Sequence, residues 1–244
     1  MPWTDYVLFR NAKKSRVIQN IGGIANLTWL RARGSEKDVI AFDCGPGNMV
    51  IDALVKHFSR GKKSFDTGGR LASRGRPDNK LFADMVARVD PFMMMPPPRS
   101  LGREEFGEPF VQSLLARHSR RVTRAEDWIA TATHLTAQTL FLSYWLYLRN
   151  NRDILSIDEI ILCGGGAKNV AMIELVRGYL RAADRGEHIA IRQMDEFGIS
   201  TQAKECVSFA MLAAACVDRV PANLMQVTGA KRRVVLGQII AINK

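Results

Sequence analysis

The sequence of 244 residues has little of the chemistry that metal centres and disulfide scaffolds need. Its four cysteines lie far apart and form no CxxC pair, and its four histidines show no metal-ligand spacing. Cys44 and Cys163 fall in or beside apolar runs, where a reduced thiol behaves as a small hydrophobe. These absences argue against structural zinc, other side-chain metal sites and disulfides, and they indicate a protein of the reducing cytoplasm.

Long apolar runs are also lacking. Residues 1–5 have neither the basic nor the apolar region of a signal peptide. A mostly apolar stretch, residues 129–148, is interrupted by threonine, histidine, glutamine and serine, which favours a buried core helix over a membrane span. With 47% hydrophobic residues the chain can bury a substantial core, so we expect a globular protein with no membrane partner.

Acidic residues are outnumbered, since 24 Asp and Glu face 35 Lys and Arg and leave a net charge of +11. Basic clusters lie at residues 10–16, 60–63, 117–124 and 231–233. The excess could attract nucleotide phosphates or nucleic acid, although a solvated basic surface is the simpler interpretation. No aromatic residues interleave with the basic runs as a base-stacking platform requires, so we expect no nucleic-acid partner.

What the sequence does contain is three β-type runs, each broken by glycines, at residues 19–28, 39–48 and 160–169. In the second, a short apolar strand leads to Asp43, Gly45 and Gly47, and Asn48 is placed to cap a helix at 49–58. The glycines let backbone N–H groups approach an anion, and a helix start favours negative charge. Asp43 is then placed to accept a proton beside a phosphate, although capping its own turn is the simpler role.

The coarse pattern predicts an α/β fold. Strands are expected at residues 17–20, 25–30, 39–43, 159–163 and 188–194, and helices at 49–58, 79–89, 104–115, 124–149, 170–180 and 201–217. The first three strands are typical of a meander, and the later alternation of strands with helices indicates a mostly parallel sheet covered on both faces. Residues 234–240 are either a last strand or a packed tail.

Two segments are expected to be irregular. Residues 61–76 form a loop-rich insertion, and residues 90–103 contain three consecutive prolines, which fix an extended backbone. The second segment is either a rigid connector or a loop that projects Arg99, Ser100 or Arg103 toward a ligand or a facing lobe. The sequence favours neither interpretation.

Together these segments resemble the anhydro-N-acetylmuramic acid kinases, members of the sugar kinase, heat-shock-70 and actin superfamily. The matching pieces, in the family's order, are residues 19–26, 42–48, 96–104, 163–169, 204–205 and 227–230. The resemblance implies an α/β, ribonuclease-H-like fold with a mixed sheet flanked by helices. Because members of the family begin with a whole N-terminal lobe, residues 1–15 are expected to be a connector from a missing lobe. Residues 16–244 are expected to be the C-terminal nucleotide-binding and catalytic lobe, essentially complete.

The resemblance also implies a function. Such kinases use ATP and Mg²⁺ to hydrolyse the 1,6-anhydro bridge of anhydro-N-acetylmuramic acid and to phosphorylate O6, which gives N-acetylmuramic acid 6-phosphate in cell-wall recycling. The expected partners are therefore an amino sugar and ATP, and a homodimer is a further possibility because family members commonly form one. The alternative is a truncated, catalytically inactive remnant that binds a nucleotide or a partner.

Carried over residue by residue, the resemblance makes Asp43 the base that deprotonates the attacking water. Nucleotide contacts are expected from Gly45, Gly47 and Asn48 at the phosphates, from Gly164, Gly165 and Gly166 against the adenosine, and from Asn169 at the next helix start. Glu205 would hold a sugar hydroxyl, although an exposed acid favoured by the helix dipole is nearly as good an interpretation. The chain departs from the family at Cys44 and Leu101, where threonine is usual, at Arg99, where lysine is frequent, and at Gln202, where aspartate is frequent.

Overall fold

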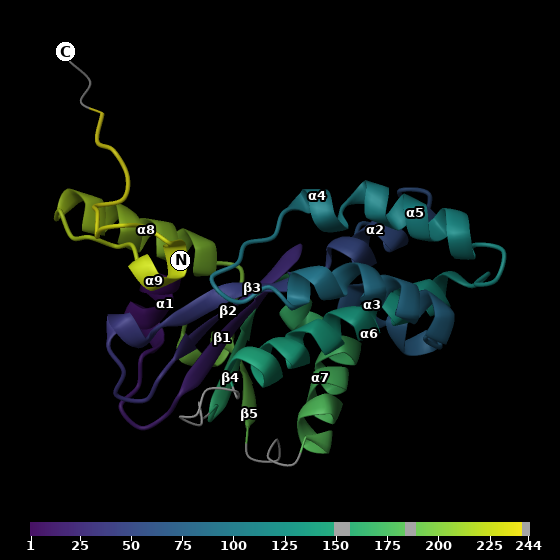
Figure 1. Cartoon of the computed structure of the whole chain (residues 1–244), viewed down its shortest axis with the longest axis horizontal. Helices are drawn as coiled ribbons and strands as arrows, with labels where there is room; N and C mark the ends of the chain where they lie inside the picture. The colour runs from purple at the N-terminus through teal and green to yellow at the C-terminus, as the bar shows by residue number, and fades with distance from the viewer. Residues whose placement is uncertain (149–156, 184–188, 241–244) are drawn as a thin grey trace.

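The computed structural model describes residues 1–148, 157–183 and 189–240, and its centre is a five-stranded mixed sheet (Figure 1). The strands are β1 (Arg16–Ile21), β2 (Ile24–Leu30), β3 (Ile40–Pro46), β4 (Glu159–Cys163) and β5 (Ala190–Gln193), in the order β3-β2-β1-β4-β5. The first three form an antiparallel meander, and β4 and β5 run parallel to β1. The predicted α/β fold, with a mixed sheet flanked by helices, is confirmed.

The first three strands form the predicted meander, and the parallel pairings are the two that involve β4, so the sheet as a whole is half parallel instead of mostly parallel. Short connections join these three strands, and a short connection can only reverse the chain and give an antiparallel pair. Helices, by contrast, separate β3 from β4 and β4 from β5, which leaves room for the crossovers that parallel pairing needs.

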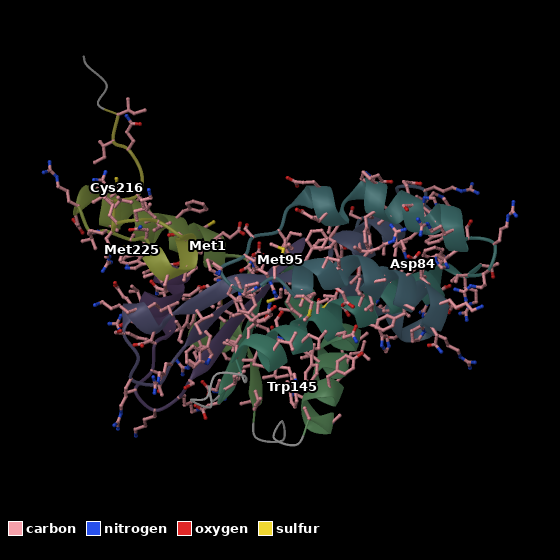
Figure 2. All side chains as sticks on the ribbon, viewed as in Figure 1. Met1, Asp84, Met95, Trp145, Cys216 and Met225 are labelled. Atoms are coloured by element: carbon pink, nitrogen blue, oxygen red, sulfur yellow. The ribbon has the colours of Figure 1, made fainter. Side chains whose placement is uncertain are left out.

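Helices cover both faces of the sheet (Figure 1). The main core lies under α2 (Met49–Phe58), α3 (Asn79–Met93), α5 (Glu108–His118), α6 (Ala125–Ser143) and α7 (Val170–Ala182). A smaller core lies on the opposite face, where α1 (Pro2–Phe9) and α9 (Met225–Thr228) contribute to it and α8 (Lys204–Val217) packs against α1. Met1 and Met225 lie on this second side of the molecule (Figure 2).

The apolar run of β4 is buried on both faces because successive side chains of a strand point to opposite sides. Ile160 and Leu162 belong to the main core, and Ile161 and Cys163 belong to the smaller one. Burial raises the pKa of the Cys163 thiol to about 11, as expected for a cysteine that serves as a small hydrophobe.

Helix α3 continues four residues beyond its predicted end at residue 89, into the segment 90–103 that was expected to be irregular. Its buried stripe of Leu81, Met85, Val89 and Met93 repeats every four residues and passes Pro91 without a break. The proline removes one backbone donor near the helix end, but packing of Met93 in the main core offsets that loss. Proline therefore did not mark the boundary here.

Other boundaries differ by shorter distances. The helix predicted at 104–115 is two helices, α4 (Arg103–Phe106) and α5, which are separated at Gly107. Helix α6 ends at Ser143, and a π-helical turn, Tyr144–Leu148, follows it up to the undescribed residues 149–156. Helix α8 begins at Lys204 instead of residue 201, residue 188 of the last predicted strand lies outside the described residues, and residues 234–240 are irregular and largely exposed.

The mostly apolar stretch at 129–148 is a core helix, as predicted. Trp128 and Leu140 of α6 are fully buried, and α6 packs against α2, α3 and α7. In the part of the chain that the structure describes, no helix has the length and apolar character needed to cross a membrane.

Residues 1–15 contain α1, which packs against α8 and β2. The buried Asp5 carboxylate of α1 accepts a hydrogen bond from the Thr28 hydroxyl at 2.8 Å and forms an ion pair with the buried Lys204 ammonium at 3.1 Å. The segment is therefore tied to the sheet and to α8, while its link to a further lobe remains a prediction.

Candidate active site

Three glycine loops meet at the carboxyl edge of the sheet. β4 pairs in parallel with β1, and β3 has the same direction because two antiparallel pairings separate it from β1. The residues that follow these three strands therefore reach one edge. There the Asn48 side-chain amide donates to the Ile21 carbonyl at 3.2 Å, and a Cβ atom on Gly166 would lie 2.2 Å from Ile21 Cγ2. The three sequence motifs thus form one packed unit.

The backbone donors at the start of α2 are already engaged. The N–H groups of Gly47 and Met49 donate to the Gly23 carbonyl at 2.9 and 3.1 Å, and the Asn48 N–H donates to the Gly22 carbonyl at 2.8 Å. The β1–β2 turn therefore closes the helix start that was expected to receive a phosphate. A phosphate contact by Gly47 or Asn48 remains a prediction, but its expected route through backbone N–H groups has no support in this structure.

Gly45 and Gly164 are required by their backbone conformations. Gly45 has φ of 120° and Gly164 has φ of 80°, which lie in the left-handed region that side chains disfavour. A Cβ atom on Gly45 would also lie 3.2 Å from the Thr139 side chain of α6, and one on Gly164 would lie 2.7 Å from the Ile21 carbonyl. Both glycines thus have a structural reason to be present, and their predicted nucleotide contacts stay untested.

Asp43 lies in the middle of β3, which continues to Pro46, and the proline-rich segment holds it there. Its carboxylate accepts the backbone N–H of Leu101 at 2.7 Å, and its own N–H donates to the Arg99 carbonyl at 3.3 Å. The side chain is half-buried, and burial raises the pKa of Asp43 even though the Leu101 N–H and Arg99 favour the charged form. An oriented carboxylate with a raised pKa is a better proton acceptor than an exposed one.

The sequence left open whether the proline-rich segment projects Arg99, Ser100 or Arg103 toward a ligand, and Arg99 does not, because its side chain points into the protein. The side chain is buried and donates to the carbonyl groups of Asp43, Met93 and Met95, each at 2.7 Å. Its guanidinium also lies against the rings of Phe42 and Tyr147, 4.9 and 4.7 Å from their centroids. Met95 lies near the middle of the molecule (Figure 2), and Arg99 fastens the segment that contains it to the middle of β3.

A cavity of about 440 Å³ opens beside the third glycine loop. Its walls come from the start of α2, residues 65–68, the glycine loop and residues 201–202. The predicted site residues that line the cavity are Asn48, Gly164, Gly165, Gly166 and Asn169. Those that do not line it are Asp43, Gly45, Gly47 and Glu205. The volume lies within the usual range for a small-molecule pocket.

Several residues of this cavity were not among the predicted site residues, and they include Asp52, Phe65, Asp66 and Lys168. The Asp66 carboxylate accepts the N–H groups of Leu71 and Ala72 at 2.8 and 3.0 Å. Asp52 is half-buried, and burial together with the nearby Asp66 raises the pKa of Asp52 to about 6. The only feature of the sequence that could have indicated Asp52 is its spacing, since it lies one helical turn after Asn48 and on the same side of α2.

Asn169 and Glu205 have different settings. Asn169 caps α7, where its side chain accepts the Met172 N–H at 3.1 Å, so its predicted place at a helix start is confirmed. Glu205 is exposed in the first turn of α8, which agrees with the helix-dipole interpretation. Its predicted contact with a sugar hydroxyl remains a prediction.

Comparison with known proteins gives a consistent family match. A family model described as anhydro-N-acetylmuramic acid kinase matches residues 1–242. The curated protein of that name from Caldanaerobacter subterraneus subsp. tengcongensis is 37% identical over 98% of this chain and 58% of its own length. The one from Bacillus thuringiensis subsp. konkukian is 37% identical over 98% of this chain and 59% of its own length. The chain thus spans less than two thirds of these relatives.

Among solved structures, similarity is weaker. The activator of the 2-hydroxyisocaproyl-CoA dehydratase from Clostridium difficile, with bound ADPNP, aligns with 79% of this chain and 57% of its own. The sequence identity is 14% and the TM-score is 0.44, and a likeness at this level supports no inference about the site.

Proposed function

Because this chain belongs to the anhydro-N-acetylmuramic acid kinase family, we propose that it performs the family's reaction on an anhydro amino sugar with ATP. The internal 1,6-anhydro bridge is hydrolysed, and the O6 oxygen receives the γ-phosphoryl group. The product is N-acetylmuramic acid 6-phosphate, a sugar phosphate of cell-wall recycling. Since the chain spans 58% of its Caldanaerobacter relative, the activity of the whole protein is part of this proposal.

In the proposed reaction, water attacks the anomeric carbon from the face opposite the bridge oxygen. The bond between that carbon and the bridge oxygen breaks, and the departing oxygen, now O6, takes the γ-phosphoryl group and leaves ADP. The water must lose a proton as it attacks, and Asp43 is the proposed acceptor. The raised pKa of the Asp43 carboxyl strengthens it as a base.

Magnesium would accompany the nucleotide, because it bridges phosphate oxygens and offsets their charge. In residues 1–148, 157–183 and 189–240, no three His, Cys, Asp or Glu side chains are grouped so that they could hold a metal ion. A magnesium ion that is held mainly by phosphates and water needs no such group of side chains.

The observation that carries the proposal is the setting of Asp43. Asp43 lies in β3 at the level of Cys163, the last residue of β4, and the Leu101 N–H fixes the orientation of its carboxylate at 2.7 Å. Arg99 braces the same segment through three backbone carbonyl groups. Such bracing is what a general base needs, since its efficiency depends on position before pKa.

The test is a coupled assay of ADP release with and without anhydro-N-acetylmuramic acid. The parent chain is compared with Asp43→Asn and with the control Glu174→Gln, whose side chain is 62% exposed on α7. We expect sugar-dependent turnover in the parent and the control, and a loss of about 100-fold to 10,000-fold in Asp43→Asn with ATP binding retained. Equal turnover in Asp43→Asn would remove the base assignment. A parent chain that binds ATP without turnover would show that this chain is the inactive remnant instead.

A further inference from the structure

The cavity beside the third glycine loop has three kinds of wall. Gly164, Gly165 and Gly166 form a floor without side chains. Opposite them, the segment at 65–68 includes Phe65, which is 59% exposed although it is a large aromatic residue. Asp52 lines the cavity from the first turn of α2. A flat floor, an aromatic ring at the rim and a carboxylate in one cavity suit a planar base joined to a polyol.

Asp52 has acceptor capacity to spare. In the described part of the chain, nothing donates a hydrogen bond to its carboxylate, and only its backbone N–H is used, toward the Asn48 carbonyl at 2.7 Å. Asp66 is different, because the N–H groups of Leu71 and Ala72 each bind one of its two oxygens. Of the two acids in the cavity, Asp52 is therefore the one that is free to bind a ligand.

The chemistry of this acceptor narrows what it can recognise. A charged carboxylate accepts two hydrogen bonds side by side, and the matching group on a nucleoside is the vicinal diol of ribose. Asp52 and Asp66 would repel a phosphate group placed beside them, whereas Lys168, which lines the same cavity, would attract one, so the triphosphate is expected away from the two acids. That leaves the α2 side of the cavity, where Asp52 lies, for the sugar of the nucleotide.

We propose that Asp52 binds the ribose diol of the nucleotide and so selects ribonucleotides over 2′-deoxyribonucleotides. The inference rests on the proposed function, since it assumes that a nucleotide occupies this cavity. It adds a specificity residue on α2 that the glycine motifs do not contain. The adenine amino group is the other donor on the nucleotide that a carboxylate could bind. The experiment distinguishes binding to the ribose diol from binding to this amino group.

The test is isothermal titration calorimetry of ATP, 2′-deoxy-ATP and inosine triphosphate with the parent chain, Asp52→Ala and the control Glu174→Gln. We expect the parent and the control to bind ATP about tenfold or more tighter than 2′-deoxy-ATP, because a lost bond to a charged group costs that much. In Asp52→Ala this ratio should fall to about one, while the ratio of ATP to inosine triphosphate stays as in the parent. Thermal unfolding confirms that each variant is folded.

Two results would overturn the inference while the proposed function stands. One is an unchanged ratio of ATP to 2′-deoxy-ATP affinity in Asp52→Ala. The other is a change in the ratio of ATP to inosine triphosphate instead, which would assign Asp52 to the base amino group. A folded parent chain that binds none of the three nucleotides would overturn the proposed function and this inference together.

Discussion

Asp52 also allows a prediction about stability that needs no substrate. Burial raises the pKa of Asp52 from its ordinary 3.8 to about 6, and the neighbouring Asp66 adds to the effect. The folded protein therefore binds this proton more tightly than the unfolded chain does. The stabilising contribution is complete below the unfolded pKa and is lost as pH rises through the folded pKa. Above neutral pH the Asp52 carboxylate is charged and half-buried, which lowers the free energy of unfolding of the parent chain.

The substitution Asp52→Asn removes that cost because asparagine is neutral at every pH in the experiment. The two pKa values differ by an amount that corresponds to about 3 kcal/mol if it were fully expressed. Solvent reaches part of the side chain and screens its charge, so we expect about 1 kcal/mol. Asp52→Asn should equal the parent in free energy of unfolding at about pH 4 and exceed it by about 1 kcal/mol at about pH 8.

The assay is urea unfolding at several pH values, followed by circular dichroism, with Glu174→Gln as the matched acid-to-amide control on an exposed helix surface. The control should show no comparable growth of its difference from the parent, because its side chain is 62% exposed. A difference between Asp52→Asn and the parent that stays flat from acid to alkaline pH would refute the reasoning. So would a difference that grows in favour of the parent.

Two further predictions concern buried charges outside the cavity, and both are measured by urea unfolding at neutral pH. Lys204→Met should lower the free energy of unfolding by about 3 to 5 kcal/mol because it leaves the buried Asp5 carboxylate without its ion-pair partner. Adding Asp5→Asn should restore most of the loss. Additive losses from the two substitutions would contradict this prediction. Arg99→Met should lower the free energy of unfolding by about 3 kcal/mol because three hydrogen bonds to carbonyl groups and two ring contacts are lost. Arg99→Lys should have an intermediate effect. A loss below about 1 kcal/mol in Arg99→Met would contradict this prediction.

The strands and their glycine loops could be predicted from the sequence because both depend on local patterns. The run at 159–163 matches β4 to the residue, and its alternation between two cores explains why every residue in it is buried. The first three strands were found within a few residues of their ends. Gly45 and Gly164 have left-handed backbone conformations, which favour glycine. This preference is local, so the turns could be predicted from the glycines without knowledge of tertiary contacts.

The errors came from contacts that are distant in sequence. Pro91 was expected to end a helix, but the buried stripe that includes Met93 extends α3 beyond it. The N–H groups of Gly47 and Asn48 were expected to be free, but the β1–β2 turn, more than twenty residues earlier, supplies their acceptors. Asp52 and Phe65 belong to no motif, because only the fold brings α2 and the following loop to the third glycine loop.

Asp52 shares two properties with the proposed base, since it is also half-buried and its pKa is also raised. The geometry separates them. Asp43 is oriented by the Leu101 N–H and by a segment that Arg99 braces, and it lies outside the cavity. Asp52 lines the cavity and has no donor among the described residues, so nothing holds it in one direction until a ligand arrives. A base must be positioned before its substrate binds, whereas a binding residue can be ordered by its ligand, and this difference supports the proposals of Asp43 as the base and of Asp52 as a binding residue.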